Sequence, residues 1–210
     1  MKKVILLFAF GVLSTAIFSQ SDKFQKGMQT NIALLDSAKT AADLTTVAAN
    51  FERIGDAEKT QWLPYYYAGL ALTRVGWVDQ KIDKDKNAEQ IKALCNKAEA
   101  IDKNAEIFSI RNMAATQQML VNPQERWQTY GQEASAALQQ GMQLDPNNPR
   151  LYYLQGMTLF NTPEQFGGGK EKAKPVFEKS LALFKAFKPK SDLYPTWGQK
   201  ITEQMLEQCK

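Results

Sequence analysis

The feature that most constrains the fold is a helix–turn–helix pattern that occurs more than once along the chain. The stretch KAEAIDKNAE, residues 97–106, aligns without gaps with QGMQLDPNNP, residues 140–149. In both, an Ile or Leu followed by Asp closes a helix, turn residues that include Asn follow, and a new helix begins. Asn148 and Pro149 suit such a start, because Asn is a good N-cap and Pro fits the first helical position. No stretch alternates with the period of two that strands require, so the sequence predicts an all-α protein.

A second internal match concerns the helix that follows each turn. YYYAGLAL, residues 65–72, aligns with YYLQGMTL, residues 152–159. Each places a Tyr four residues before a Gly and a Leu three residues after it, which puts the three on one helix face. A glycine inside a helix costs roughly 1 kcal/mol relative to Ala. Its presence predicts a second helix that packs too closely to leave room for a Cβ atom.

These spacings resemble the tetratricopeptide repeat (TPR), a helical hairpin with an aromatic residue and a Gly on its first helix. The best-matching unit carries Tyr152, Gly156 and Leu159, then Ala173, Phe177, Ser180 and Leu181. The earlier units offer Tyr65, Gly69, Leu72, Cys95 and Ala98, and then Met113, Ala134, Leu138, Gly141 and Pro146. Gly69 to Met113 spans 44 residues and Met113 to Gly156 spans 43, against about 34 in a standard repeat. The resemblance therefore implies divergent hairpins with long loops.

The resemblance implies a specific architecture: antiparallel helix hairpins stacked as a short TPR-like right-handed solenoid with a C-terminal capping helix. We expect one domain over residues 20–210. The expected hairpins cover about residues 23–54, 62–101, 105–144 and 149–187, and the cap covers residues 191–209. A cap is expected because the end faces of a repeat array are otherwise apolar and exposed.

The N-terminus has the parts of a secretory signal peptide. Met1-Lys2-Lys3 is followed by a ten-residue apolar run and then by small and polar residues. The run is shorter than the roughly 20 residues of a membrane span. No cysteine follows it, which argues against a lipoprotein anchor. We expect residues 1–19 to be removed and a soluble protein to be exported to the periplasm or medium, with no stable membrane insertion.

Composition excludes several function classes. The 210 residues are 44% hydrophobic and 23% charged, as in a globular protein. The net charge is +4, and without the two lysines of residues 1–19 it is 24 − 22 = +2, which is too small to indicate nucleic-acid binding. The chain contains no histidine, which rules out Ser-His-Asp and Cys-His catalysis and any zinc site that uses imidazole. No nucleophile with an evident base can be named. We therefore predict no catalytic residue, no metal site and no cofactor.

Two local motifs are rejected as ligand sites, and one pairing stays open. The run Gly167 to Lys170 lacks the Ser or Thr that a phosphate-binding loop needs after its Lys, so it is predicted to be a joint between helices. The run Asp83 to Glu89 looks briefly like a calcium loop, but Ala88 stands where an EF-hand requires Gly. Cys95 and Cys209 would be permitted a disulfide in an exported chain, and the sequence does not decide whether they form one.

The concave side of a TPR array commonly receives an extended peptide or protein segment. In the register of the repeat match, this side carries Tyr66, Arg74, Gln117, Gln118, Arg150, Tyr153 and Asn161. The first hypothesis is therefore a non-catalytic protein- or peptide-binding scaffold of the cell envelope. The second is a small-ligand-binding accessory subunit of a transporter. The glycine joint and the KEKAKPVFEKSL that follows it resemble TPR-like periplasmic subunits associated with TRAP transporters. The least supported hypothesis is a carboxylate-based hydrolase.

Overall fold

A computed structural model describes residues 22–210, and within them every regular element is a helix. The predicted signal peptide at residues 1–19 lies outside the described residues. The helices are α1 (Asp22–Ser37), α2 (Ala41–Glu58), α3 (Leu63–Val78), α4 (Lys84–Ile101), α5 (Ala105–Met119), α6 (Pro123–Arg126), α7 (Gln132–Leu144), α8 (Pro149–Asn161), α9 (Lys170–Ala186) and α10 (Gln199–Gln208). A π-helical turn, η1 (Trp127–Gly131), joins α6 to α7, and a 3-10 turn, η2 (Glu164–Phe166), precedes α9.

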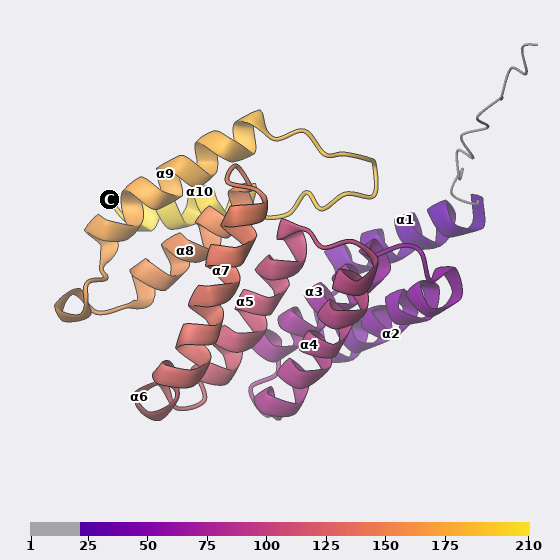
Figure 1. The fold of residues 1–210 in the computed structure, drawn as a ribbon, viewed down its shortest axis with the longest axis horizontal. Helices are drawn as coiled ribbons and strands as arrows, with labels where there is room; N and C mark the ends of the chain where they lie inside the picture. The colour runs from indigo at the N-terminus through magenta and orange to yellow at the C-terminus, as the bar shows by residue number, and fades with distance from the viewer. Residues whose placement is uncertain (1–21) are drawn as a thin grey trace, which may run out of the picture.

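The helices form a stack of hairpins (Figure 1). Consecutive helices pack together from α1 to α5, α5 then packs on α7, and α8 packs on α9. The first helices of successive hairpins also touch: α1 contacts α3, α3 contacts α5, and α5 contacts α8. Contacts between neighbours along a stack are what a solenoid-like fold requires. The predicted all-α fold of stacked hairpins is confirmed.

The helix ends follow from local sequence. Thr40 and Asp43 form a capping box at the start of α2, in which the Thr40 hydroxyl oxygen accepts from the Asp43 N–H at 3.1 Å. The Asn148 side chain caps α8 by accepting from the Arg150 N–H, and Pro149 fills the first helical position, as the sequence predicts. These caps satisfy backbone N–H groups that have no partner inside the helix.

The glycine inside α8 marks the predicted close approach of a second helix. A Cβ atom added to Gly156 would come within 2.5 Å of the Phe177 ring on α9. Phe177 itself is fully buried. Glycine at this position therefore lets the two helices of the last hairpin pack ring against backbone.

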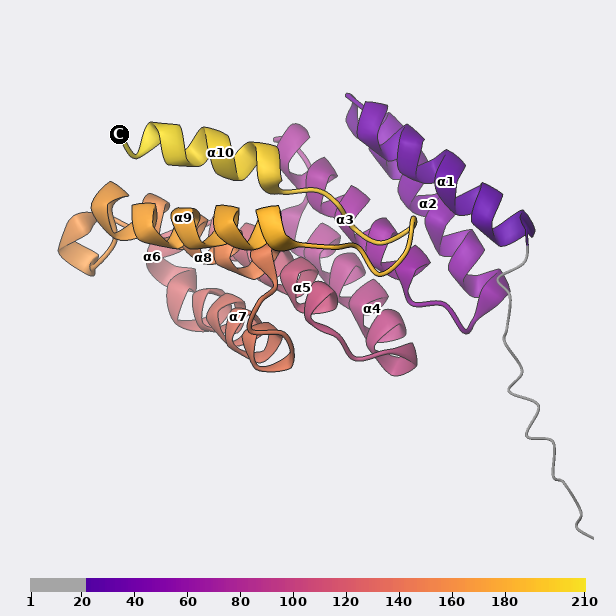
Figure 2. The same ribbon diagram turned by 90° about the horizontal axis from the view of Figure 1, so that it is seen from above.

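The core has two parts that share α5. One cluster spans α1 to α5, and the other spans α5 and α7 to α10. Residues 187–198, which we call the C-terminal strap, link α9 to α10 without regular structure. Figures 1 and 2 show the strap running from α9 toward α3 and turning back to α10. Its Leu193 is buried in the first cluster, so the strap ties the two parts of the core together.

The closing helix is shorter than the sequence predicts. Helix α10 begins at Gln199, whereas a cap over residues 191–209 is expected from the sequence. Pro195 lies within the strap, and Gly198 has φ +118°, a conformation that ends helical geometry. None of the helices between Asp22 and Lys210 combines the length and the apolar character that a membrane span needs.

Candidate functional site

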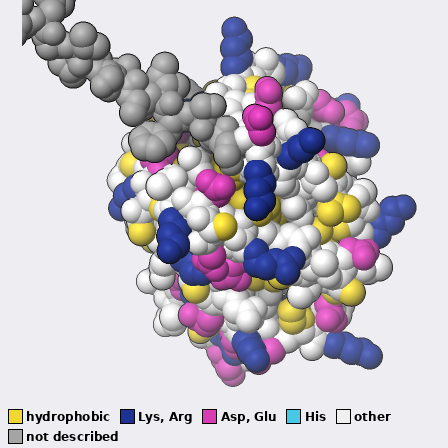
Figure 3. Space-filling model, turned by 90° about the vertical axis from the view of Figure 1, so that its right-hand side faces the viewer, with side chains coloured by type: hydrophobic (Ala, Val, Ile, Leu, Met, Phe, Trp, Pro, Cys, Tyr) yellow, Lys and Arg dark blue, Asp and Glu magenta, His cyan; other side chains and the backbone are white. Residues whose placement is uncertain are grey.

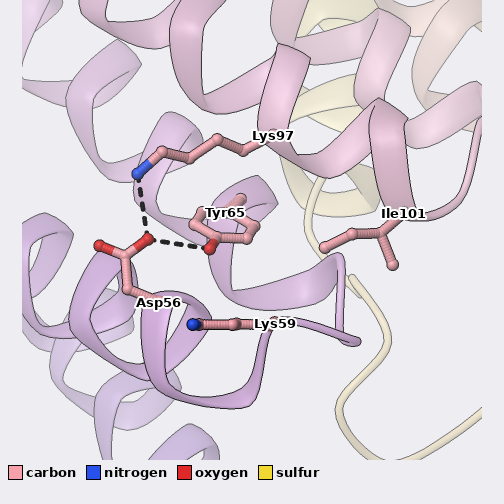
Figure 4. A pocket seen from close by; sticks show the side chains of 5 residues that line it. All are labelled: Asp56, Lys59, Tyr65, Lys97 and Ile101. Carbon is pink, nitrogen blue, oxygen red and sulfur yellow. Dashed lines mark hydrogen bonds and ion pairs between the residues drawn. The ribbon is translucent and has the colours of Figure 1, made fainter.

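A recess of about 540 Å³ opens where the end of α2 meets α3 and α4 (Figure 4). Its lining residues are Asp56, Lys59, Tyr65, Lys97 and Ile101. In Figure 4 the Asp56 carboxylate and the ammonium groups of Lys59 and Lys97 gather on one side, whereas Ile101 lies on the other. The volume falls within the roughly 300–1,000 Å³ of small-molecule sites. The recess is shallow and open to solvent, and its lining combines charged groups with one aliphatic side chain and a phenol.

The Tyr65 side chain is fixed from three directions. Its ring lies against Gly55, where an added Cβ atom would come within 2.8 Å of the ring. The hydroxyl donates to the Asp56 carboxylate at 2.9 Å. Lys97 donates to the same carboxylate at 3.0 Å and to Glu52 at 2.9 Å, and its Nζ lies 5.2 Å from the centre of the Tyr65 ring. The aromatic wall of the recess is therefore pre-organised by neighbouring side chains.

These contacts set the protonation states of the site. The hydrogen bonds from Lys97 and then from Tyr65 lower the pKa of the Asp56 carboxyl. Burial, followed by the neighbouring Asp56, raises the pKa of the Tyr65 phenol. At neutral pH Asp56 is thus an anion and Tyr65 a neutral phenol that donates a hydrogen bond. A phenol held in this form is neither a nucleophile nor a general base.

Lys59 is the unusual residue of the recess. It follows the last residue of α2 with φ +53°, which makes it the single non-glycine residue with positive φ among residues 22–210. Its backbone N–H donates to the Gly55 carbonyl at 2.8 Å and closes the helix. Glycine is the usual residue at such a helix end, because a side chain is disfavoured there. The side chain is exposed and, within the described part of the chain, has no ion-pair partner.

A second recess, of about 210 Å³, lies beside the strap. It is lined by Gln61, Trp62, Leu63, Asp102, Asn104, Lys190, Ser191 and Tyr194. The rings of Trp62 and Tyr194 meet edge to face at 6.0 Å between centroids and form its aromatic wall. Its volume is below the usual range for small-molecule sites.

The seven residues predicted for a concave binding face do not share an open surface in this structure. Five are buried, with exposed fractions between 0% and 8%: Tyr66, Gln117, Gln118, Arg150 and Tyr153. Arg74 is half-buried and donates to the Leu35 carbonyl at 2.9 Å, and Asn161 is exposed at the end of α8. Their role in partner binding stays a prediction.

The buried glutamines bind neighbouring helices. Gln117 donates to the Thr73 carbonyl of α3 at 2.7 Å. Gln118 donates to the Glu89 carboxylate of α4 at 3.1 Å. Both amides therefore link α5 to the hairpin before it.

Arg150 forms the centre of a buried cluster. Its Nε and Nη2 donate to the two carboxylate oxygens of Glu106 at 2.7 and 2.6 Å, and both side chains are fully buried. The Asn148 amide donates to the same carboxylate at 2.6 Å. The guanidinium lies 4.6 Å from the centre of the Phe187 ring and donates to the Trp197 carbonyl at 3.3 Å. Both Phe187 and Trp197 belong to the strap.

The strap covers the other two predicted aromatic residues as well. Trp197 Nε1 donates to the Tyr66 hydroxyl at 2.7 Å. The Tyr153 ring meets the Trp197 ring edge to face, with centroids 6.3 Å apart. Tyr66, Arg150 and Tyr153 therefore all lie against the strap, and the segment that covers them is part of the same chain.

The glycine run connects η2 to α9 in the structure. The N–H groups of Gly167, Gly168 and Gly169 donate to carbonyls of the preceding segment, so they are not free to hold a phosphate. This confirms the predicted joint. Cys95 and Cys209 are both free thiols. No group of three or more Cys, Asp or Glu side chains suited to a metal ion occurs in residues 22–210.

The face shown in Figure 3 intersperses basic and acidic side chains without a broad field of one sign. A concentrated basic surface is the usual footprint of nucleic-acid binding. This face of the molecule offers none.

Sequence reasoning missed Lys59, Lys97 and Asp56 as lining residues and assigned Tyr65 to packing alone. The left-handed conformation of Lys59 has no signal in the sequence. The meeting of Asp56 with Lys97 joins residues 41 positions apart, which only the packing of α2, α3 and α4 decides. A signal was available in Gly55, a helical glycine like those that mark close approach elsewhere in the chain.

Comparison with known proteins gives one similar structure. No known family profile matches the chain, and no curated protein sequence matches it. The chain is similar to the solved structure of the HusA haemophore from Porphyromonas gingivalis, with 38% sequence identity and a TM-score of 0.82. The match covers 91% of this chain and 94% of that chain.

Proposed function

Because the chain belongs to the family of the HusA haemophore, we propose that it is a non-catalytic carrier of haem or of a closely related tetrapyrrole. The observation that carries the proposal is 38% identity sustained over nearly the whole of both chains. The site chemistry is compatible with it, because the recess offers ammonium groups, the Ile101 side chain and the edge of the buried Tyr65 ring but no activated nucleophile. Aromatic and cationic groups suit a flat ring system that carries carboxylates.

Such a carrier would hold the ring system and its carboxylates rather than depend on the iron. The chain has no histidine, which leaves Tyr, Met and Cys as the usual protein ligands of haem iron. Cys95 is buried, and burial raises the pKa of its thiol to about 12. The raised pKa of Tyr65 likewise disfavours the phenolate that iron would bind. We therefore expect a metal-free porphyrin to bind about as well as haem.

A titration tests this proposal. Haem and protoporphyrin IX would each be added to the protein while ligand absorbance and tryptophan fluorescence are recorded. We expect both ligands to give saturable changes with dissociation constants within about tenfold of each other, a difference of roughly 1.4 kcal/mol. Saturable binding of haem alone would instead assign the affinity to iron coordination. Absence of saturation with either ligand would refute the carrier function.

The finer features predicted from the sequence belong to the same proposal. We propose that the hairpin stack is a divergent TPR-like right-handed solenoid and that residues 1–19 direct export. Export suits a carrier that collects its ligand outside the cell. Mass spectrometry of the protein from its native cells would test this, because a chain that begins near Gln20 is expected and a chain that retains Met1 would contradict it.

Binding of a protein partner is the second candidate function. The observation that favours it is the strap, since an extended segment already lies against Tyr66, Arg150 and Tyr153. A partner peptide could occupy this face only by displacing residues 187–198. A crosslinking pull-down from envelope extract, with a Tyr66→Ala/Tyr153→Ala double variant as comparison, would test this. A partner lost from the folded variant would support the face, and equal capture would contradict it.

A further inference from the structure

We propose that Lys59 binds a carboxylate of the carried tetrapyrrole in the recess between α2, α3 and α4. This inference rests on the proposed function and adds the site and the ligand group that is recognised there. The ring system would lie against Ile101 and the edge of the Tyr65 ring, which is 5% exposed, and the carboxylate would meet the ammonium group at the rim.

The backbone at Lys59 is the first observation behind the proposal. A lysine occupies a left-handed position, φ +53°, at which glycine is the unstrained choice. Strained residues cluster at functional sites, where the surrounding structure holds them in place. A lysine kept at this position supplies a side chain that glycine would lack, and that side chain borders the recess.

The charge arrangement is the second observation. Lys97 already binds Asp56 and Glu52, so its ammonium group is engaged by two carboxylates. Among the described residues Lys59 has no such partner, although it borders the same recess. The Lys59 charge also helps to lower the pKa of Asp56, but less than the hydrogen bonds from Lys97 and Tyr65 do. Lys59 is therefore the less engaged cation for an incoming carboxylate, whereas Lys97 holds Asp56 and Tyr65 in place.

The distribution of polarity is the third observation. Figure 4 shows the charged groups on one side of the recess and Ile101 on the opposite side, with the Tyr65 ring between them. A ligand that fits has an apolar ring at one end and a carboxylate at the other, as a porphyrin with propionate groups does. One propionate would meet Lys59, and the recess is open enough to leave the other in solvent.

The position of Lys59 has a competing explanation. A cation near the end of a helix interacts favourably with the helix dipole. That role would depend only on the charge at the end of α2 and would not affect ligand affinity. Binding measurements therefore separate the two explanations.

The test compares Lys59→Gly, Lys59→Arg and Lys39→Gly in titrations with protoporphyrin IX and with its dimethyl ester, which lacks the carboxylates. Lys39 is a matched control, because it is an exposed lysine at the opposite end of the 18-residue helix α2. We expect Lys59→Gly to weaken binding of the free acid at least about threefold. We expect its melting temperature to stay equal or to rise, since the strained backbone is relieved. Lys59→Arg and Lys39→Gly should bind like the wild type.

The dimethyl ester gives the sharper readout. The wild type should bind the ester more weakly than the acid, and Lys59→Gly should bind both alike. If the wild type binds porphyrin but Lys59→Gly keeps the full preference for the acid, the inference is wrong while the proposed function stands. If the wild type binds neither porphyrin nor haem, the proposed function itself fails.

Discussion

Replacing Arg150 by Met should destabilise the protein far more than replacing an exposed arginine. Arg150 and Glu106 are both fully buried, and the Glu106 carboxylate accepts two hydrogen bonds from Arg150 and one from Asn148. Arg150→Met leaves that carboxylate buried with the Asn148 amide alone. Removing one partner of a buried pair costs about 3–5 kcal/mol, and we expect a loss of this size in the free energy of unfolding.

Urea unfolding followed by circular dichroism at 222 nm would measure the loss. The matched control is Arg126→Met, because Arg126 pairs with Asp85 at 2.7 Å with both side chains partly exposed, and water and salt screen such pairs so that they contribute little to stability. The double variant Arg150→Met/Glu106→Gln should recover part of the stability, since no unpaired charge is then buried. A loss for Arg150→Met no greater than that for Arg126→Met would refute the account of the buried cluster.

Three further outcomes are expected. Gly156→Ala should cost about 1–3 kcal/mol because its methyl group would strike the facing phenylalanine ring, whereas Gly27→Ala, with 3.5 Å of space, should be neutral or stabilising; thermal melts would compare them. Iodoacetamide at pH 8 should label Cys209 but not the buried Cys95 in the native protein, and mass spectrometry that found Cys95 labelled would contradict its burial. Burial raises the pKa of Tyr153 to about 12. The stability that the neutral phenol contributes is therefore complete below pH 10 and is lost as the pH rises toward 12. The free energy of unfolding of Tyr153→Phe should fall less steeply with pH over that range than that of the wild type, and equal slopes would contradict this.

The hairpins could be predicted because their signals are local. Asn148-Pro149 starts α8 through capping and a fixed proline φ, both properties of two adjacent residues. Gly156 in a helical pattern implies a close neighbour, and Phe177 is that neighbour. The structure of the C-terminal residues was harder to predict from the sequence. Pro195 and Gly198 indicate only that the last helix begins after them. The path of the strap across α3 depends on tertiary packing.

The burial of Arg150 could not be predicted from the sequence for a physical reason. Arginine is rarely fully buried unless it is paired, and its partner Glu106 lies 44 residues earlier in the chain. From the sequence, Arg150 on the first helix of the last hairpin is therefore expected on the exposed concave face. The strap also supplies the covering rings from residues 187–198, and nothing in their sequence states where they lie.

The recess could not be predicted from the sequence, because it is formed by backbone geometry that the amino-acid composition does not encode. Tyr65 packs on Gly55 as a core residue would, yet its edge lines the recess. Lys59 follows an ordinary helical sequence, and only its φ of +53° distinguishes it from other exposed lysines.

The most direct test of the carrier function and its site is a two-dimensional amide NMR titration of the protein with protoporphyrin IX. The account predicts saturable shifts centred on the amides of Lys59, Tyr65 and Ile101, with little change at Lys39. Saturable shifts centred instead beneath the strap, at Tyr66 and Arg150, would contradict the site. No saturable shift at any amide of residues 22–210 would contradict the carrier function.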